Sequence, residues 1–310
     1  MSQTSSNHSL TAIDGLHVGH WQGNGTGCTV VLCPLDGCIA SGSVRGGAPG
    51  TRETALLEPA KTIERVHAVM LTGGSAFGLA AAHGVMDYLV EQERGFLTPH
   101  GRVPIVPAAA IYDLGIAKEK PTLNSGYEAA KGASSQPIEN GRIGAGSGAL
   151  CGKYVLGGTP AFGGLGSALM EVAGAKVAAL AVCNALGDIV DHDGKLVAGA
   201  KDTTGKPIGP PRYPHFVELA FGGNTTLVVV ASDAVISKRD AYILADSAHI
   251  GIAHVTRPSH TPHDGDTCFV LSTENVAGVP LLALSVAVQE VVSQAIVNAV
   301  RAANPYHHGS

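Results

Sequence analysis

Glycine limits this chain to short structural elements joined by tight turns. The 310 residues include 41 glycines, which separate many short apolar segments and show no collagen period. This content is well above the usual share of about 7%, and glycine favours tight turns and close contacts between backbones. Hydrophobic residues make up 45% of the chain and charged residues 15%, a balance typical of a protein with a sizeable core. The pattern predicts a compact α/β protein.

Charge and hydropathy argue against several classes of partner. The net charge is −5 and no basic stripe or tail is present, which argues against nucleic acid. No stretch of about 18 uninterrupted apolar residues occurs, so we expect no membrane span. The first ten residues are polar and lack the apolar core of a signal peptide. The six cysteines are therefore expected to be reduced thiols in a cytoplasmic protein, and the absence of a CxxC pair argues against a zinc site.

Hydrophobic periodicity predicts the secondary structure. Strands are expected at 29–32, 68–71, 176–183, 226–231 and 268–271, and helices at 77–93, 167–173, 234–250 and 282–303. The apolar run 103–110 contains Pro104 and Pro107, which indicate irregular or edge geometry. Segments 144–166 and 187–214 are predicted to be loops, and the first ten and last six residues disordered tails. Since no repeat or linker is present, we expect one α/β domain, residues 1–310, with helix layers on a central sheet system.

Two polar motifs have features of a cofactor-binding site or a metal site. Segment 144–153 is similar to a phosphate-binding loop, but Ser147 stands where the first glycine is required and Tyr154 where a magnesium-binding hydroxyl belongs, so we expect no nucleotide cofactor. A second stretch gathers potential metal ligands, although its spacing differs from a helix-borne zinc motif: His254, His260, His263, Asp264 and Asp266. The alternatives are a turn at 264–266 whose two carboxylates orient an amine or hydroxyl, or an ordinary solvated Asp-Gly turn.

The stretch Asn224-Thr225-Thr226 follows two glycines and leads directly into a β-prone run. It matches a glycosylation sequon, but a chain without a signal peptide is not expected to meet that machinery. Taken alone, it is a loop entering a strand. No G-x-S-x-G serine elbow accompanies it.

Taken together, seven collinear motifs make the chain resemble the self-processing aminopeptidases, a family that includes L-aminopeptidase/D-esterases, β-peptidyl aminopeptidases and 6-aminohexanoate (nylon) oligomer hydrolases. The resemblance extends from about residue 10 to residue 303. It rests on 49–54 (PGTRET), 71–78 (LTGGSAFG), 103–113 (VPIVPAAAIYD), 146–153 (GSGALCGK), 163–167 (GGLGS), Asn224-Thr225 and 264–267 (DGDT). The Thr after Asn and the paired aspartates bring the chain nearest to the nylon-oligomer branch.

The resemblance implies a four-layer αββα sandwich, similar to N-terminal-nucleophile hydrolases but with a different strand order. It also implies that the precursor cuts itself between Asn224 and Thr225, giving chains 1–224 and 225–310 that stay together. Thr225 would then be the nucleophile and its new α-amine the base, because that amine has a pKa near about 7.7–8.0.

The family's other site residues carry over position by position. Asp264 and Asp266 are expected to orient the Thr225 amine and hydroxyl, Lys153 to act beside the nucleophile, and Asn184 with Tyr112 to bind the substrate oxyanion. No cofactor or metal is implied. The expected substrate is a short linear amide or peptide, and the expected assembly a homotetramer of cleaved units. Two alternatives remain open at this point: an acyltransferase similar to ornithine acetyltransferases, and a metal-dependent hydrolase using the cluster from His254 to Asp266.

Overall fold

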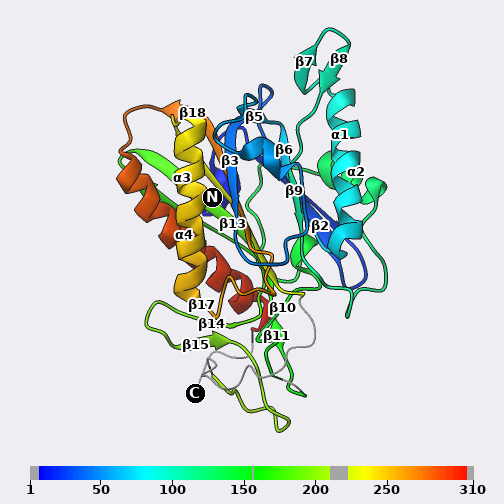
Figure 1. Ribbon diagram of the computed structural model, residues 1–310, viewed down its shortest axis with the longest axis vertical. Helices are drawn as coiled ribbons and strands as arrows, with labels where there is room; N and C mark the ends of the chain where they lie inside the picture. Colours follow the sequence, from blue (N-terminus) through cyan, green and yellow to red (C-terminus); the bar gives the residue numbers. More distant parts are fainter. Residues whose placement is uncertain (1–6, 156, 210–222, 306–310) are drawn as a thin grey trace, which may run out of the picture.

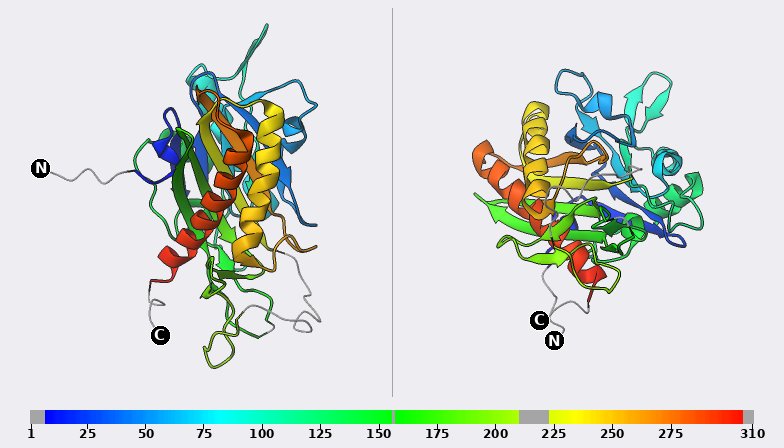
Figure 2. Two further views of the ribbon diagram at one scale, coloured as in Figure 1. Left: turned by 90° about the vertical axis from the view of Figure 1, so that its left-hand side faces the viewer. Right: turned by 60° about the horizontal axis from the view of Figure 1, so that its bottom comes forward.

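Two β-sheets stack face to face in this protein, and a pair of helices covers the outer face of each sheet (Figures 1 and 2). The computed structural model describes residues 7–155, 157–209 and 223–305. Helices α3 (Lys238–Val255) and α4 (Leu281–Ala303) lie on one side, and α1 (Ala81–Glu91) and α2 (Leu123–Lys131) on the other. This arrangement is the αββα sandwich that the family resemblance implied.

The larger sheet has six strands and carries the long central hydrophobic runs. Its strands are antiparallel except for the pair β16 and β18, which run parallel. Their order across the sheet is β12 (Gly164–Val172), β13 (Ala175–Asn184), β16 (Thr225–Ala234), β18 (Thr267–Val276), β3 (Cys38–Val44) and β5 (Arg65–Val66).

The second large sheet has five strands, in the order β1 (His17–Gln22), β2 (Gly27–Leu32), β6 (Ala68–Thr72), β9 (Ala108–Ala110) and β4 (Thr51–Arg52). Smaller sheets pair β14 (Asp188–Val190) with β15 (Leu196–Ala198) and β17 (Thr256–Arg257), β10 (Leu150–Cys151) with β11 (Ala161–Phe162), and β7 (Phe96–Thr98) with β8 (Gly101–Val103). Single 3-10 turns are η1 (Leu10–Ala12), η2 (Thr54–Leu57), η3 (Ser75–Ala80) and η4 (Gly144–Gly146).

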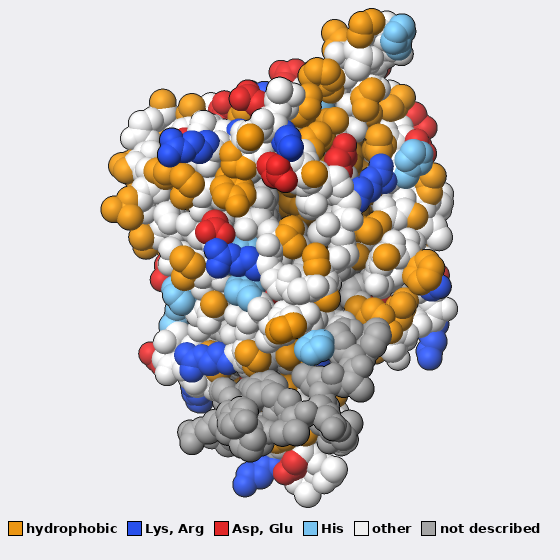
Figure 3. Space-filling model, in the orientation of Figure 1, with side chains coloured by type: hydrophobic (Ala, Val, Ile, Leu, Met, Phe, Trp, Pro, Cys, Tyr) orange, Lys and Arg blue, Asp and Glu red, His pale blue; other side chains and the backbone are white. Residues whose placement is uncertain are grey.

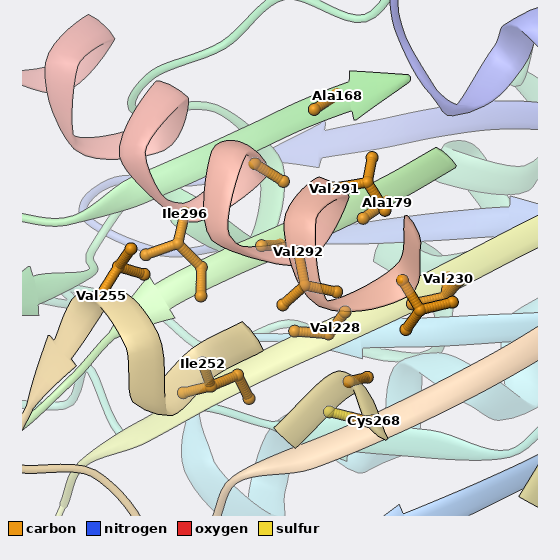
Figure 4. Close-up of a cluster of buried hydrophobic side chains, with 14 of the residues drawn as sticks. Ala168, Ala179, Val228, Val230, Ile252, Val255, Cys268, Val291, Val292 and Ile296 are labelled. Carbon is orange, nitrogen blue, oxygen red and sulfur yellow. The ribbon is translucent and has the colours of Figure 1, made fainter. Parts of the chain in front are cut away.

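Strand β13 shows why the layers form. Successive side chains of a strand point to opposite faces. Val177 and Ala179 pack against α3 and α4, whereas Ala178 and Leu180 pack against the second sheet. Both faces are apolar, so the strand is buried on both sides, as Figure 4 shows for the helix side, where Val228, Val230 and Cys268 meet Val292 and Ile296. The central sheet therefore contributes to two hydrophobic cores.

Local signals position the helices. Ser237 caps α3 through a capping box with Asp240, and Thr122 caps α2 in the same way with Ser125. Helices α1 and α2 approach so closely that a Cβ at Gly84 would lie 1.9 Å from the Leu123 carbonyl oxygen. Helix α4 has the length and composition of a membrane span, but half of its apolar window is buried and it lies along the central sheet.

Most of the predicted elements are confirmed. The strands expected at 29–32, 68–71, 176–183, 226–231 and 268–271 correspond to β2, β6, β13, β16 and β18, and the helices expected at 77–93 and 282–303 to η3 with α1 and to α4. The third predicted helix, at 234–250, begins later, at Lys238, because β16 continues to Ala234. The run 103–110 starts at the last residue of β8 and contains only the short β9, in keeping with the irregular geometry that its prolines indicate.

The helix predicted at 167–173 is wrong, because these residues lie mostly in strand β12. Strand β12 pairs with β13 along its whole length, from Gly164 opposite Cys183 to Val172 opposite Ala175. Ala173 and Gly174 between them have φ of 49° and 83°, as the two central residues of a type I′ hairpin turn require. Pairing with a neighbouring strand overrode the helical propensity of Ala, Leu and Met in this segment.

Two predicted irregular segments are more ordered than expected. Ser9 and Leu10 are buried rather than part of a tail, and the Leu10 N–H donates to Ser167 Oγ at 2.9 Å. The loop predicted at 187–214 contains β14 and β15, and its Asp188 is fully buried, accepting from the Ala200 N–H at 2.9 Å and from the Tyr154 hydroxyl at 2.9 Å. Residues 1–6, 210–214 and 306–310 of the predicted loop and tails lie outside the described residues.

Truncating Ile296 should test the core between α4 and the central sheet. Ile296 is fully buried, so Ile296→Ala should lower the free energy of unfolding by about 2–5 kcal/mol through lost burial and a residual cavity. Leu282 on the same helix is 77% exposed, and Leu282→Ala should change the free energy of unfolding by less than about 0.5 kcal/mol. Urea denaturation of both variants measures the difference, and equal losses would contradict the packing described.

Candidate active site

The expected site residues meet at one edge of the central sheet. Thr225 is the first residue of β16 and pairs with Asn184, the last residue of β13. Strand β18 runs parallel to β16, with Leu227 opposite Thr267, and Asn224 forms a bridge with Asp264. Because parallel neighbours begin at the same edge, Thr225 and the turn at 264–266 are brought together.

The peptide carbonyl between Asn224 and Thr225 is buried and receives two hydrogen bonds. The Gly265 N–H donates to the Asn224 carbonyl oxygen at 2.9 Å, and the Thr225 hydroxyl donates to the same oxygen at 2.5 Å. Gly265 has no room for a side chain, since a Cβ would lie 2.7 Å from the Ala48 carbonyl oxygen and 2.9 Å from Thr225 Oγ1. The Thr225 hydroxyl therefore lies beside a carbonyl that a backbone N–H polarises.

Lys153 and Asn184 hold the preceding carbonyl, that of Gly223. Lys153 Nζ donates to the Gly223 carbonyl oxygen at 3.1 Å and to the main-chain and side-chain oxygens of Asn184 at 2.9 and 3.0 Å. Asn184 Nδ2 lies 3.3 Å from the carbonyl oxygens of Gly223 and Tyr112. Tyr112 thus meets Asn184 through its main chain.

Burial makes Lys153 an unusual lysine. Removal from water disfavours the ammonium and lowers the pKa of Lys153 from 10.5 to about 8, although the negative charges of Asp264 and Asp266 partly oppose the shift. A lysine with this pKa exchanges a proton close to neutral pH. The glycine-rich segment 144–153 carries this side chain into the site.

Asp264 and Asp266 are both 1% exposed and are held differently. Asp264 Oδ2 accepts from the Thr261 N–H at 2.8 Å and from the Thr261 hydroxyl at 2.6 Å. Burial, together with the nearby charge of Asp266, raises the pKa of Asp264. Asp266 Oδ1 accepts from the Thr226 N–H at 2.6 Å, and its Oδ2 faces His260. The carboxylates therefore flank the start of β16.

A cavity of about 200 Å³ opens beside the Asn224 carbonyl group. Its lining surface is mostly apolar, and its polar side chains include Asp113, Lys153, Asn184 and Asn224, as in small-molecule sites generally. The complete lining is Tyr112, Asp113, Gly115, Ile116, Gly148, Leu150, Lys153, Asn184, Leu186, Gly223 and Asn224.

Sequence reasoning missed two members of this site. Asp113 is buried and accepts from the Thr26 hydroxyl at 2.6 Å and from the Gly74 N–H at 2.7 Å, and burial raises its pKa. A lone acid at the end of an apolar run was the signal that could have identified it. Gly265 was treated only as part of a turn, and nothing in the sequence revealed that its N–H meets the Asn224 carbonyl.

The potential metal ligands do not converge. His254 lies exposed in the last turn of α3, while His260 faces Asp266. Within 7–155, 157–209 and 223–305, no group of three or more His, Cys, Asp or Glu side chains is arranged to hold a metal ion. On the face shown in Figure 3, acidic and basic side chains are interspersed, without a basic stripe.

Sequence comparisons place the chain among amide-cleaving proteins. The model of Peptidase family S58 matches residues 8–309. A protein of Mycobacterium leprae named an uncharacterized aminopeptidase is 40% identical over 292 residues, which cover 86% of this chain and 78% of that protein. A 6-aminohexanoate-oligomer endohydrolase of Paenarthrobacter ureafaciens is 30% identical over 276 residues, covering 84% and 74%.

Solved structures share the fold at low sequence identity. A Burkholderia sp. β-aminopeptidase has a TM-score of 0.70 and 22% identity, covering 98% of this chain and 89% of that one. The L-aminopeptidase D-Ala-esterase/amidase of Ochrobactrum anthropi, described as a variant of the N-terminal-nucleophile hydrolase fold, has a TM-score of 0.69 and 20% identity, covering 98% and 88%. These likenesses confirm the expected fold class.

The lowered pKa of Lys153 predicts selective chemistry at its amine. At pH 8 about half of Lys153 should be neutral, whereas a lysine of pKa 10.5 is almost fully protonated. A limiting dose of acetic anhydride should therefore acetylate Lys153 with a midpoint near pH 8, as measured by peptide mass mapping between pH 6 and 11. Exposed Lys131 is the matched control. Acetylation of both lysines with the same midpoint would contradict the shift.

Proposed function

The chain belongs to peptidase family S58 and is an amide hydrolase, and from this premise we propose that it cuts itself between Asn224 and Thr225 and then uses Thr225 as its nucleophile. The products are a chain of 224 residues and one of 310 − 224 = 86 residues. The contact that carries the proposal is the 2.5 Å hydrogen bond from the Thr225 hydroxyl to the Asn224 carbonyl oxygen.

Self-cleavage proceeds by an acyl shift. Thr225 Oγ1 adds to the Asn224 carbonyl carbon, while the Gly265 N–H, 2.9 Å from the carbonyl oxygen, stabilises the developing negative charge. The C–N bond then breaks, the hydroxyl proton passes to the nitrogen, and an ester replaces the amide. Water hydrolyses this ester, leaving an Asn224 carboxylate and a Thr225 with both a free amine and a hydroxyl. The glycines before Asn224 supply the backbone freedom for a strained turn.

The α-amine of Thr225 that self-cleavage releases supplies the base for the reaction. Its pKa near about 7.7–8.0 leaves part of it neutral at pH 7, so it accepts the Thr225 hydroxyl proton as the oxygen attacks a substrate carbonyl. Asp264 and Asp266 orient the amine and hydroxyl and relay protons, and Lys153 stabilises anionic intermediates. Asn184 and Tyr112 serve the substrate oxyanion, where one amide donor lowers the barrier by about 3 kcal/mol. Water releases the acyl group.

The substrate class is short linear amides, either 6-aminohexanoate (nylon) oligomers or N-terminal aminoacyl amides. The cavity of about 200 Å³ is smaller than the roughly 300–1,000 Å³ of typical drug-sized sites, which favours one short unit of a chain. The relatives named as an aminopeptidase and an oligomer endohydrolase support these two candidates.

Family membership favours hydrolysis over the two alternatives. The acyltransferase reading requires an acyl acceptor other than water, and nothing in the relatives' names indicates one. The metal-dependent reading requires a ligand cluster, and the described residues around His254 and Asp266 do not form one. The metal-dependent reading is therefore the weaker of the two.

We also propose that the cleaved units assemble into a homotetramer and that the protein is cytoplasmic. The cytoplasmic location is supported by the cysteines, all six of which are buried and unpaired. Neither nucleic acid nor a membrane is proposed as a partner.

Substitution of the nucleophile should block self-cleavage. On denaturing gels the wild type should give two fragments, whereas Thr225→Ala should give one full-length band and lose amidase activity by roughly a thousandfold or more. Thr226→Ala is the matched control, because the hydroxyl of Thr226 has no hydrogen-bond partner among the described residues and its N–H to Asp266 is kept. A wild type that remains one intact band yet hydrolyses amides would refute the mechanism.

A substrate panel should separate the three reaction classes. Aminoacyl p-nitroanilides and 6-aminohexanoate oligomers should release free amine with water as the sole acceptor, and activity should persist after treatment with a strong chelator. Product release that depends on an added acyl acceptor would favour the acyltransferase. Loss of activity on chelation and its return with a divalent metal would favour the metal-dependent hydrolase.

A further inference from the structure

His260 contacts Asp266, and the proposed reaction assigns no role to His260. It belongs to the histidine-rich stretch before Asp264, and its side chain is 18% exposed. Its φ is 54°, in the left-handed region that non-glycine residues seldom occupy, although His and Asn are enriched among those that do. Strained conformations of this kind persist where the surrounding contacts enforce them.

Those contacts involve one carboxylate oxygen, that of Asp266, and one main-chain carbonyl within helix α3. The His260 N–H donates to Asp266 Oδ2 at 3.1 Å, and ring Nδ1 of the same residue lies 2.7 Å from that oxygen, an ion-pair distance. On the other side of the ring, Nε2 lies 3.1 Å from the carbonyl oxygen of His249 in α3. A carbonyl only accepts, so Nε2 carries a hydrogen. A second hydrogen on Nδ1 makes the ring a cation against Asp266.

The charges around His260 favour that cation. Burial opposes it, but the contact with Asp266 at 2.7 Å and the negative charge of that carboxylate outweigh burial and raise the pKa of His260. The His249 ring stands edge-on at 4.9 Å between centroids, and burial lowers its pKa to about 4, so it is neutral. Arg45 opposes the cation but is paired with Asp246 at 2.5 Å. Asp266 is therefore the ionic partner of His260.

Thr261, the residue after His260, holds the other aspartate, Asp264, in a different way. Thr261 gives Asp264 two neutral donors, its N–H and its hydroxyl, and no positive charge. Two consecutive residues thus hold the two carboxylates of the site, one with a ring cation in direct contact and one with neutral donors, while the charge of Lys153 partly opposes the rise in the pKa of Asp264. Two buried carboxylates that interact do not both ionise readily, so an unequal environment decides which of them holds a proton.

We propose that His260 is a positioning residue that, as an imidazolium, holds the Asp266 carboxylate on the Thr226 N–H, so that Asp264 is the aspartate that exchanges a proton with the Thr225 amine. The inference rests on the proposed function of Thr225. No bond to His260 is made or broken, and its effect passes through Asp266.

His260→Asn separates charge from hydrogen bonding. Asn tolerates the left-handed backbone, keeps the N–H and offers a side-chain amide near the position of ring Nδ1, but it carries no charge. In the self-cleaved enzyme, kcat on an aminoacyl p-nitroanilide or a 6-aminohexanoate oligomer should fall about tenfold with KM changed less than about twofold. Self-cleavage, which needs no added substrate, should slow as well.

The pH profile of kcat/KM is the measurement that a purely structural role of His260 would leave unchanged. The acidic limb of kcat/KM reports protonation of the Thr225 amine, the proposed base. Loss of the nearby positive charge in His260→Asn favours the protonated amine and should therefore move this limb to higher pH. His260→Ala, which also lacks the amide, should lose about a hundredfold in kcat. His254→Ala, an exposed histidine in the last turn of α3, is the matched control and should behave as the wild type. A wild-type kcat and an unshifted limb in His260→Asn would overturn the inference.

A measurement on the wild type covers the case in which the variants do not fold. Histidine-selective ¹⁵N NMR should find one imidazole that titrates above the ordinary value near about 6.5 and that titrates lower in Asp266→Asn. The stabilisation from this pair is complete below about pH 6.5 and is lost as the pH rises through the raised pKa. Imidazoles that all titrate at or below the ordinary value would exclude the ionic role.

The wild type distinguishes failure of this inference from failure of the proposed function. If wild-type protein neither cuts itself nor releases amine, the proposed function is wrong. If it does both and His260→Asn matches it, the role assigned to His260 alone is wrong.

Discussion

Strands β16 and β18 lie side by side and run in the same direction, and the candidate active site depends on that parallel pair. Parallel pairing brings the starts of both strands to one edge of the sheet, with Leu227 opposite Thr267. Thr225 and the turn at 264–266 are therefore neighbours although some 40 residues separate them in the chain. An antiparallel pair would have placed the hydroxyl and the aspartates at opposite ends of the sheet.

The edge where these strands begin is buried, which gives each polar contact more weight. Buried polar groups are costly unless they are hydrogen-bonded, and here the carbonyls of Gly223 and Asn224 are both satisfied, one by Lys153 and Asn184 and the other by Gly265 and Thr225. The same burial lowers the pKa of Lys153 and raises that of Asp264. The environment that buries these carbonyls thus also shifts the pKa of both groups, that of Lys153 to about 8.

Sequence patterns predicted the long central elements well and the short or paired ones poorly. The runs that became β13, β16 and β18 are apolar on both faces and were recognisable as buried strands. The sequence predicts a helix where strand β12 forms, because its Ala, Leu and Met favour helix and only pairing with β13 makes it a strand. It predicts a tail at Leu10, because the burial of Leu10 depends on a distant partner, Ser167.

The sequence by itself determined which residues we propose for the chemistry: Thr225, Lys153, Asn184 and the two aspartates stand in motifs that can be read in order along the chain. Only the tertiary structure decided which groups these residues contact, because a hydrogen bond depends on distance and direction in space. The Gly265 N–H on the Asn224 carbonyl, the main-chain contact of Tyr112 with Asn184 and the ion pair of His260 with Asp266 all join segments that meet only when the sheet forms.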